Sequence, residues 1–121
     1  MIKEYVKTAI VLLVIDILWI KLVMSKRFNP LVRRIQKGDD LMIRLIPSLL
    51  SYAFLVIGLQ YFIIDKKATA SEAFLLGIII YGVFEATSMA IFKDWDYGTL
   101  VLDTLWGGIL YYITYHIVTR V

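Results

Sequence analysis

The sequence predicts an all-α, polytopic membrane protein, a bundle of four transmembrane helices joined by short loops. Of its 121 residues, 60% are hydrophobic and only 19% are charged, whereas a soluble domain is typically about half apolar and about a quarter charged. The charges are also bunched, and the long uncharged stretches between the bunches are typical of helices that cross a bilayer.

The four expected spans cover residues 5–24, 42–64, 73–92 and 99–119. Each has roughly the 20 residues needed to cross about 30 Å of hydrocarbon at about 1.5 Å per residue. Helices are favoured over a barrel because no segment of barrel-strand length alternates with a two-residue period. We therefore expect residues 1–121 to form one multi-pass membrane domain with no separate soluble domain.

The first span also resembles a signal peptide at its charged start, Met1 to Lys7. Its apolar run is too long for one, however, contains Asp16, and ends without a small-residue cleavage site. A membrane span is the favoured interpretation.

Two of the connections are short. Thr69 and Glu72 have the spacing of a capping box that opens the third helix. Trp95 and Tyr97, between the third and fourth spans, suit an aromatic belt at the membrane interface.

The longest connection, residues 25–41, is basic. Arg33, Arg34 and Lys37 could hold lipid headgroups from a short amphipathic helix on the membrane surface. An ordinary basic loop that sets topology is the favoured alternative. More basic residues flank this side than the side of the termini, so the positive-inside rule places the long loop in the cytoplasm and the termini outside.

Three acids, Asp16, Glu85 and Asp103, lie inside the expected spans. An ionisable group at that depth is costly and is a functional-site hypothesis by default. Counted along their helices, all three lie roughly 6–12 Å below the same membrane face. A shared acidic pocket is one interpretation, and carboxyl groups that only lock the helices together are the other.

Small and polar residues on the same helical faces support a common interior, because they allow close packing and hydrogen bonding where lipid offers neither. The expected neighbours of the acids are Tyr52, Tyr81, Ser88 and, at the end of the second span, Arg44. Ser51, Gly77 and Gly107 belong to the same stripes.

The first and fourth spans each contain Asp-x-x-Trp, as Asp16 with Trp19 and Asp103 with Trp106. Since these helices run in opposite directions, each tryptophan comes level with the aspartate of the other helix. Indole N–H is only a donor, so we expect Trp19 to donate to Asp103 and Trp106 to Asp16.

The composition excludes several kinds of site. With no cysteine and one histidine, the chain has no disulfide, thiolate or multi-histidine metal site, and we expect no metal, no cofactor and no catalytic residue. His116 lies about 20 Å along its helix from Asp103 and is expected near the interface. Asp94 and Asp96 are more typical of a turn than of a cation site. A net charge of +3 is too weak and scattered for nucleic acid, so membrane lipids and a homo-oligomer are the expected partners.

Several of these motifs together resemble a family of small predicted membrane proteins, domain of unknown function 2177 (DUF2177), found in bacteria, algae and large DNA viruses. The motifs are Asp16-x-x-Trp19, Tyr81-Gly82-Val83-Phe84-Glu85-Ala86-Thr87-Ser88-Met89-Ala90, Trp95 and Asp103-x-x-Trp106-Gly107. The resemblance covers nearly the whole chain and implies four spans and a role for Asp16, Glu85, Thr87, Asp103 and Trp106. It implies no activity. The family usually has Asp in place of Glu85 and Asn in place of Ser88, which would change the reach of these side chains.

Three functions fit the pattern. The first is binding or transport of a cation, protons or a cationic amphiphile by an acidic pocket inside the membrane. The second is a structural or accessory role, for example as a subunit of a virion or a membrane complex. The third is a lipid-modifying enzyme using the acids as general acid and base, which is weakened by the lack of an evident nucleophile.

Overall fold

Four helices make up the described part of the chain, residues 2–24 and 45–120, in this computed structural model. The first, α1, covers Ile2–Trp19 and continues as a π-helical segment, η1, over Ile20–Met24. The second, α3, covers Leu45–Leu59 and continues as η2 over Gln60–Ile64. The described residues contain no strand, which confirms the all-α prediction.

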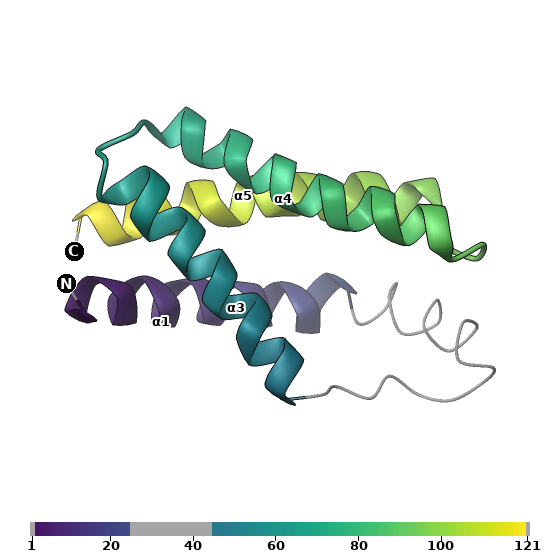
Figure 1. Ribbon diagram of the computed structural model, residues 1–121, viewed down its shortest axis with the longest axis horizontal. Helices are drawn as coiled ribbons and strands as arrows, with labels where there is room; N and C mark the ends of the chain where they lie inside the picture. Colours follow the sequence, from purple (N-terminus) through teal and green to yellow (C-terminus); the bar gives the residue numbers. More distant parts are fainter. Residues whose placement is uncertain (1, 25–44, 121) are drawn as a thin grey trace.

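The third and fourth helices form an antiparallel hairpin. They are α4, Ala70–Ile91, and α5, Tyr97–Arg120, and they lie side by side over much of their length (Figure 1). Both begin earlier than expected because their caps extend them. Asp96 accepts a hydrogen bond from the Thr99 backbone N–H at 2.6 Å, so this residue is part of the turn, as expected, and its carboxyl group serves the start of α5.

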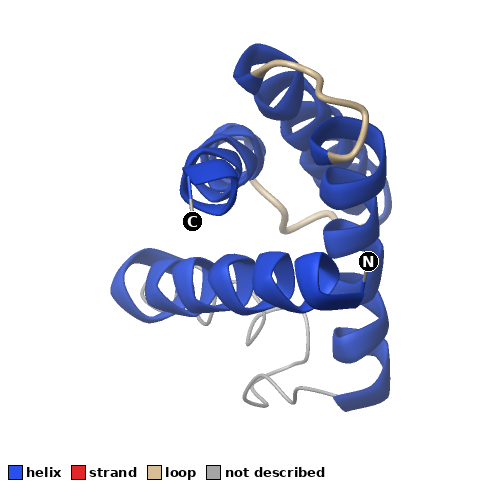
Figure 2. Ribbon diagram, turned by 90° about the vertical axis from the view of Figure 1, so that its left-hand side faces the viewer, coloured by secondary structure: helices blue, strands red, loops and turns tan. Residues whose placement is uncertain are grey.

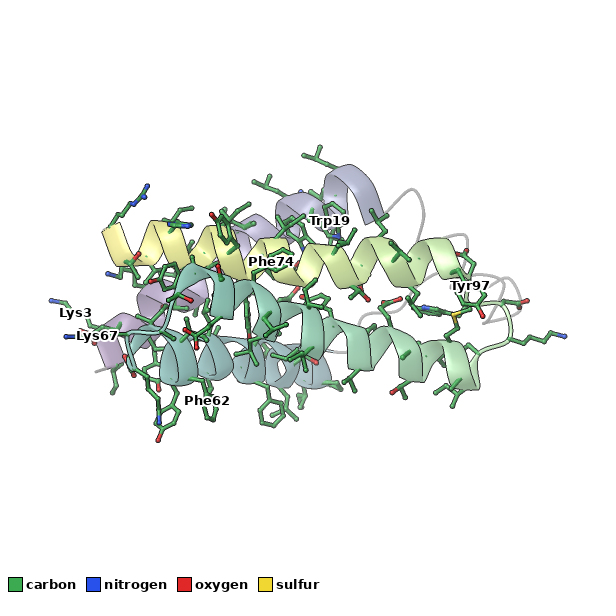
Figure 3. All side chains as sticks on the ribbon, turned by 90° about the horizontal axis from the view of Figure 1, so that it is seen from above. Lys3, Trp19, Phe62, Lys67, Phe74 and Tyr97 are labelled. Carbon is green, nitrogen blue, oxygen red and sulfur yellow. The ribbon has the colours of Figure 1, made fainter. Side chains whose placement is uncertain are left out.

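The other two helices pack against this hairpin. In Figure 1, α3 crosses α1 obliquely, and both termini lie at one end of the bundle. Figure 2 looks from that end and shows both termini near the viewer. Figure 3 places Lys3 and Lys67 at the same end and Tyr97 at the opposite end. The helices thus alternate in direction, as expected.

The turn between α3 and α4 is fixed by hydrogen bonds at both sides. The predicted capping box is present: Thr69 accepts from the Glu72 backbone N–H, and Glu72 accepts from that of Thr69. On the other side, Lys67 N–H donates to Ile64 O and Ala68 N–H to Ile63 O. That is the hydrogen-bond pattern of a Schellman motif.

The core is a single cluster at the centre of the bundle, to which every helix contributes. Its members are Leu12, Leu55, Val56, Leu59, Ile63, Ala73, Trp106, Leu110 and Tyr111. The outer faces are also apolar: Ile46, Leu75 and Val83 are 78%, 57% and 63% exposed. Apolar residues on the outside as well as in the core are expected of a helix bundle surrounded by lipid.

Two helices are long and apolar enough to cross a membrane, Ile46–Ile64 and Ala70–Ile91. Only 22% and 17% of their most apolar windows are buried, unlike the core helix of a soluble protein. The other two expected spans are helical but do not meet this criterion. Charged residues such as Lys7 and Asp16 interrupt α1, and Asp103 and several tyrosines lower the hydropathy of α5.

The α4–α5 hairpin is held together by glycines. A Cβ atom built on Gly77 would lie 2.1 Å from the Gly107 carbonyl oxygen, so the two backbones touch. A Cβ on Gly108 would meet the side chains of Phe74 and Ile78 at 2.8 Å. These contacts confirm that small residues face the interior at these positions and bring α4 and α5 close enough for their polar side chains to meet.

Some expectations concern residues that lie outside the described part of the chain. These are the basic loop 25–41 with Arg33, Arg34 and Lys37, and Arg44. For α3, the expected interior face was partly wrong. Ser51 is exposed, and the buried face is formed by Leu55, Leu59 and Gln60.

Candidate functional site

Asp16 joins three helices. Its Oδ2 accepts a hydrogen bond from the Tyr52 hydroxyl of α3 at 2.5 Å, and its Oδ1 accepts one from Trp106 Nε1 of α5 at 2.9 Å. The residue is 6% exposed. Because both oxygens have donors, this carboxyl group is well suited to hold α1, α3 and α5 together.

The two tryptophans of the Asp-x-x-Trp pairs stack on each other. The rings of Trp19 and Trp106 are 4.3 Å apart at an interplanar angle of 3°. The expected bond from Trp106 to Asp16 is present, but the expected bond from Trp19 to Asp103 is not: Trp19 Nε1 is buried and has no hydrogen-bond partner within residues 2–24 and 45–120. Stacking fixes the plane of the Trp19 ring, and its N–H reaches no acceptor within that plane.

Glu85 is fully buried on α4. Its Oε1 accepts a hydrogen bond from Trp95 Nε1 at 2.8 Å. Trp95 is itself only 6% exposed, and its ring packs edge-on against Phe84. The other oxygen of Glu85, Oε2, is buried and receives no hydrogen bond from a donor in the described residues. One oxygen of this carboxyl group therefore has an indole donor, and the other has no donor among the described residues.

Asp103, on α5, lies beside Glu85. The two carboxyl groups are within hydrogen-bonding reach of each other, and Asp16 is within electrostatic range of Asp103. Tyr81 interacts electrostatically with both Asp16 and Asp103. The three acids thus come from three helices into one region of the bundle, and Glu85 and Asp103 form its closest acidic pair.

Two carboxyl groups in contact need a proton or a cation between them. At the effective dielectric of a protein, about 20, two like charges about 4 Å apart repel each other by about 4 kcal/mol. A proton bound to one group makes it a donor to the other and removes the repulsion. In residues 2–24 and 45–120, no three His, Cys, Asp or Glu side chains are arranged to hold a metal ion.

The remaining expected site residues divide into two groups. Tyr52, Tyr81 and Ser88 lie on inward faces, with Ser88 buried next to the Glu85 turn. Thr87 is exposed on the opposite side of α4 from Glu85, because two helical positions correspond to a rotation of about 200°. His116 lies elsewhere on α5, half-buried between the rings of Tyr112 and Tyr115.

A second buried polar network lies toward the terminal end of the bundle. The Thr8 hydroxyl donates to Gln60 Oε1 at 2.5 Å, and Gln60 Nε2 donates to Asp65 Oδ1 at 2.7 Å. Thr8 and Gln60 are both fully buried, whereas Asp65 is exposed. We did not anticipate this network. Gln60, the one glutamine in the second expected span, was the signal that could have indicated it.

Trp95 was also missed as a site residue, since its place in a short connection indicated an interfacial aromatic.

A groove lined by Ser71, Phe74, Ile109 and Tyr112 lies on the α4–α5 hairpin. None of the three acids contributes to its lining.

Comparison with known proteins agrees with the resemblance noted in the sequence. No curated protein and no solved structure matches the chain. Residues 1–118 match the family described as "Predicted membrane protein (DUF2177)". This match covers nearly the whole chain, including the helices that carry Asp16, Glu85 and Asp103. The protein therefore belongs to the DUF2177 family of membrane proteins.

Proposed function

We propose that the protein is a multi-pass integral membrane protein that binds and releases a proton at the Glu85–Asp103 pair. The observation that carries the proposal is the buried oxygen Oε2 of Glu85. It has no donor among the described residues, while the Asp103 carboxyl group lies within hydrogen-bonding reach of Glu85. A proton on either acid supplies the missing hydrogen bond.

Four crossings of the bilayer fit the arrangement of the helices. Their directions alternate and both termini lie at one end (Figure 1). The two helices that fall short of a simple hydropathy criterion each carry one acid within the bundle: Asp16 of α1 is buried and Asp103 of α5 is half-buried. Intramembrane acids that face the inside of a bundle recur in proton relays.

The surroundings favour this pair, rather than Asp16, as the proton site. Asp16 has a donor on each oxygen, so its charged form is already hydrogen-bonded. Among the described residues, Asp16 of α1 and Tyr81 of α4 are the titratable groups within electrostatic range of Asp103. Tyr52 of α3 is one step further away, because it donates its hydrogen bond to Asp16. A proton suits this pair because it converts one carboxyl group into a hydrogen-bond donor for the other.

Trp95 provides the readout that tests the proposal. Its indole N–H donates to Glu85, so its NMR signal should move when the pair gains or loses a proton. We expect a pH titration of the purified, 15N-labelled protein in detergent micelles to shift the Trp95 indole signal. The three tryptophans give three such signals, which single Trp→Phe variants assign.

The controls separate the pair from other acids. Glu85→Gln and Asp103→Asn should each abolish the pH-dependent shift, whereas Asp94→Asn, at an exposed site in the same connection as Trp95, should leave it intact. A Trp95 signal that does not move with pH in the folded wild-type protein would refute the proposal. A shift that follows added sodium or potassium at constant pH would point instead to a cation.

A further inference from the structure

The two buried polar networks occupy opposite halves of the same bundle. The acidic pair lies in the half toward the connection between α4 and α5, where Trp95 binds Glu85. The Thr8–Gln60–Asp65 network lies in the half toward the termini, and its last member, Asp65, is exposed next to the turn that carries Lys67. Figure 3 shows Lys67 and Tyr97 at opposite ends of the molecule. Buried polar groups are thus present in both halves of the bundle.

The packing between α1 and α5 gives the order of these groups. The Trp106–Asp16 hydrogen bond fixes which residues of the antiparallel helices are level with each other. Moving one turn along both helices from this bond reaches Leu12 and Leu110, and one turn further reaches Thr8 and Thr114. All four of these side chains are fully buried. An apolar layer therefore separates the acids from a pair of threonines.

Thr114 supports a ligand or water in the terminal half. Its hydroxyl is buried and has no hydrogen-bond partner among the described residues, although a threonine in a helix can usually bond to the backbone of the preceding turn. A buried polar group without a partner is costly, and an internal water with two or more polar neighbours is the common solution. Thr8 and Gln60 provide such neighbours at the same level of the bundle.

A tyrosine lies beside this apolar layer, next to Leu110 on α5. The Tyr111 hydroxyl, fully buried on α5, donates to the Leu55 carbonyl at 2.5 Å and interacts electrostatically with Tyr81. Tyr81 in turn interacts with Asp103 and Asp16. Tyr81 also packs against the core cluster that contains Tyr111. Hydroxyl groups can both accept and donate a proton, so these two tyrosines are the groups at this level that could carry one.

We propose that the protein conducts protons across the membrane, with Asp65, Gln60 and Thr8 forming the terminal half of the path and Glu85 with Asp103 forming the other half. The proposal rests on proton binding at the Glu85–Asp103 pair. A proton from water on one side is taken up by the Asp65 carboxylate, passes through internal water held by Thr8 and Gln60, and reaches the pair through the two tyrosines. It leaves the pair to water on the other side. Only O–H bonds form and break, and the Gln60 amide orients the path without carrying the proton.

The experiment is proton flux into sealed liposomes that contain the full-length protein and a trapped pH-sensitive dye. A potassium gradient with valinomycin provides the driving force. We expect wild-type protein to acidify the interior faster than protein-free liposomes do. Asp65→Asn should reduce the rate to the protein-free level, because asparagine can still accept the hydrogen bond from Gln60 but cannot take up the proton.

The matched control is Glu4→Gln, which removes another exposed acid from the terminal end, in α1. It should conduct like the wild type. Thr8→Val, which keeps the side-chain shape but removes the hydroxyl, should also abolish the flux. Because Thr8 is buried, the Trp95 indole spectrum of each variant serves to show that the fold and the acidic pair are intact.

The readouts separate the two proposals. A Trp95 signal that titrates normally, combined with wild-type flux no greater than that of empty liposomes, would overturn proton conduction and leave proton binding in place. Wild-type flux that persists unchanged in both Asp65→Asn and Thr8→Val would overturn the proposed path. A Trp95 indole signal that does not shift with pH in the wild-type protein would refute the proton-binding site itself.

Discussion

Trp106 of α5 donates its indole N–H to Asp16 of α1 at 2.9 Å, and this bond sets the register of the two antiparallel helices. The same carboxyl group accepts from Tyr52 of α3. We predict that Asp16→Leu destabilises the fold by about 2–3 kcal/mol, since it leaves two inward-facing donors without an acceptor. The free energy of unfolding in mixed micelles measures the loss. Glu4→Gln, on the same helix but exposed, is the control and should change little.

The stacked pair of Trp19 and Trp106 should be energetically coupled. Aromatic pairs contribute about 0.5–1.5 kcal/mol beyond the area they bury. We expect a double-mutant cycle with Trp19→Leu and Trp106→Leu to show a coupling of that size. Purely additive losses would contradict the stacking. Because Trp19 Nε1 has no partner in the part of the chain that the structure describes, its indole proton should also resonate upfield of the hydrogen-bonded Trp95 and Trp106 protons.

Glycine at position 77 is required by the packing of α4 on α5. The Cβ atom of Gly77→Ala would meet the Gly107 carbonyl oxygen at 2.1 Å, and a backbone atom cannot move aside as a flexible side chain can. We predict a loss of stability at or above the upper end of the roughly 1–3 kcal/mol that overpacking costs. Gly82→Ala is the matched control in the same helix. Its Cβ would lie 3.6 Å from Thr104 Cγ2, an ordinary contact, and it should be tolerated.

Stability should depend on pH through the Glu85–Asp103 pair. If the folded protein holds a proton there that the unfolded chain releases at neutral pH, the folded state binds more protons, and stability falls as the pH rises. Removal of the proton leaves two charges facing each other across the α4–α5 hairpin. We expect unfolding measured over a pH series to show this decline in the wild type. The decline should be absent in the double variant Glu85→Gln, Asp103→Asn. An identical pH dependence in both proteins would argue against a shared proton.

The turn after η2 contains a residue that glycine would suit better. Lys67 has a φ of 55°, in the left-handed region, at the position of the Schellman motif that glycine usually occupies. We predict that Lys67→Gly stabilises the protein by up to about 1 kcal/mol, because glycine has no Cβ to strain the backbone there. Lys67→Ala removes the same charge but keeps the Cβ and should give no such gain. Thermal unfolding of the two variants makes the comparison.

Local chemistry made several features predictable from the sequence. The helices follow from long apolar stretches. The Thr69–Glu72 capping box depends on residues three positions apart, and the inward stripe of Gly77, Tyr81, Glu85 and Ser88 depends on helical periodicity. The common depth of the three acids follows from counting residues along helices whose directions must alternate. The capping box lies within one turn and the stripe within one helix, and the expected depth of the acids needs only the alternating directions of the helices.

Relationships between helices required the tertiary structure. Periodicity places Trp19 and Trp106 on facing sides of α1 and α5, but their ring orientations decide that they stack and that only Trp106 reaches an aspartate. The conformation of a short connection turns Trp95 inward to Glu85.

The sequence by itself determined the membrane-protein class, the helices and the acids at one depth, because burial pattern and chain geometry act along the chain. Only the tertiary structure decided which donors the acids receive. Crossing angle, helix rotation and side-chain rotamer set those partners, and no spacing in the sequence encodes them. The contact between Gly77 and Gly107 illustrates the division: the sequence indicated small residues on both helices, and the fold placed their backbones against each other.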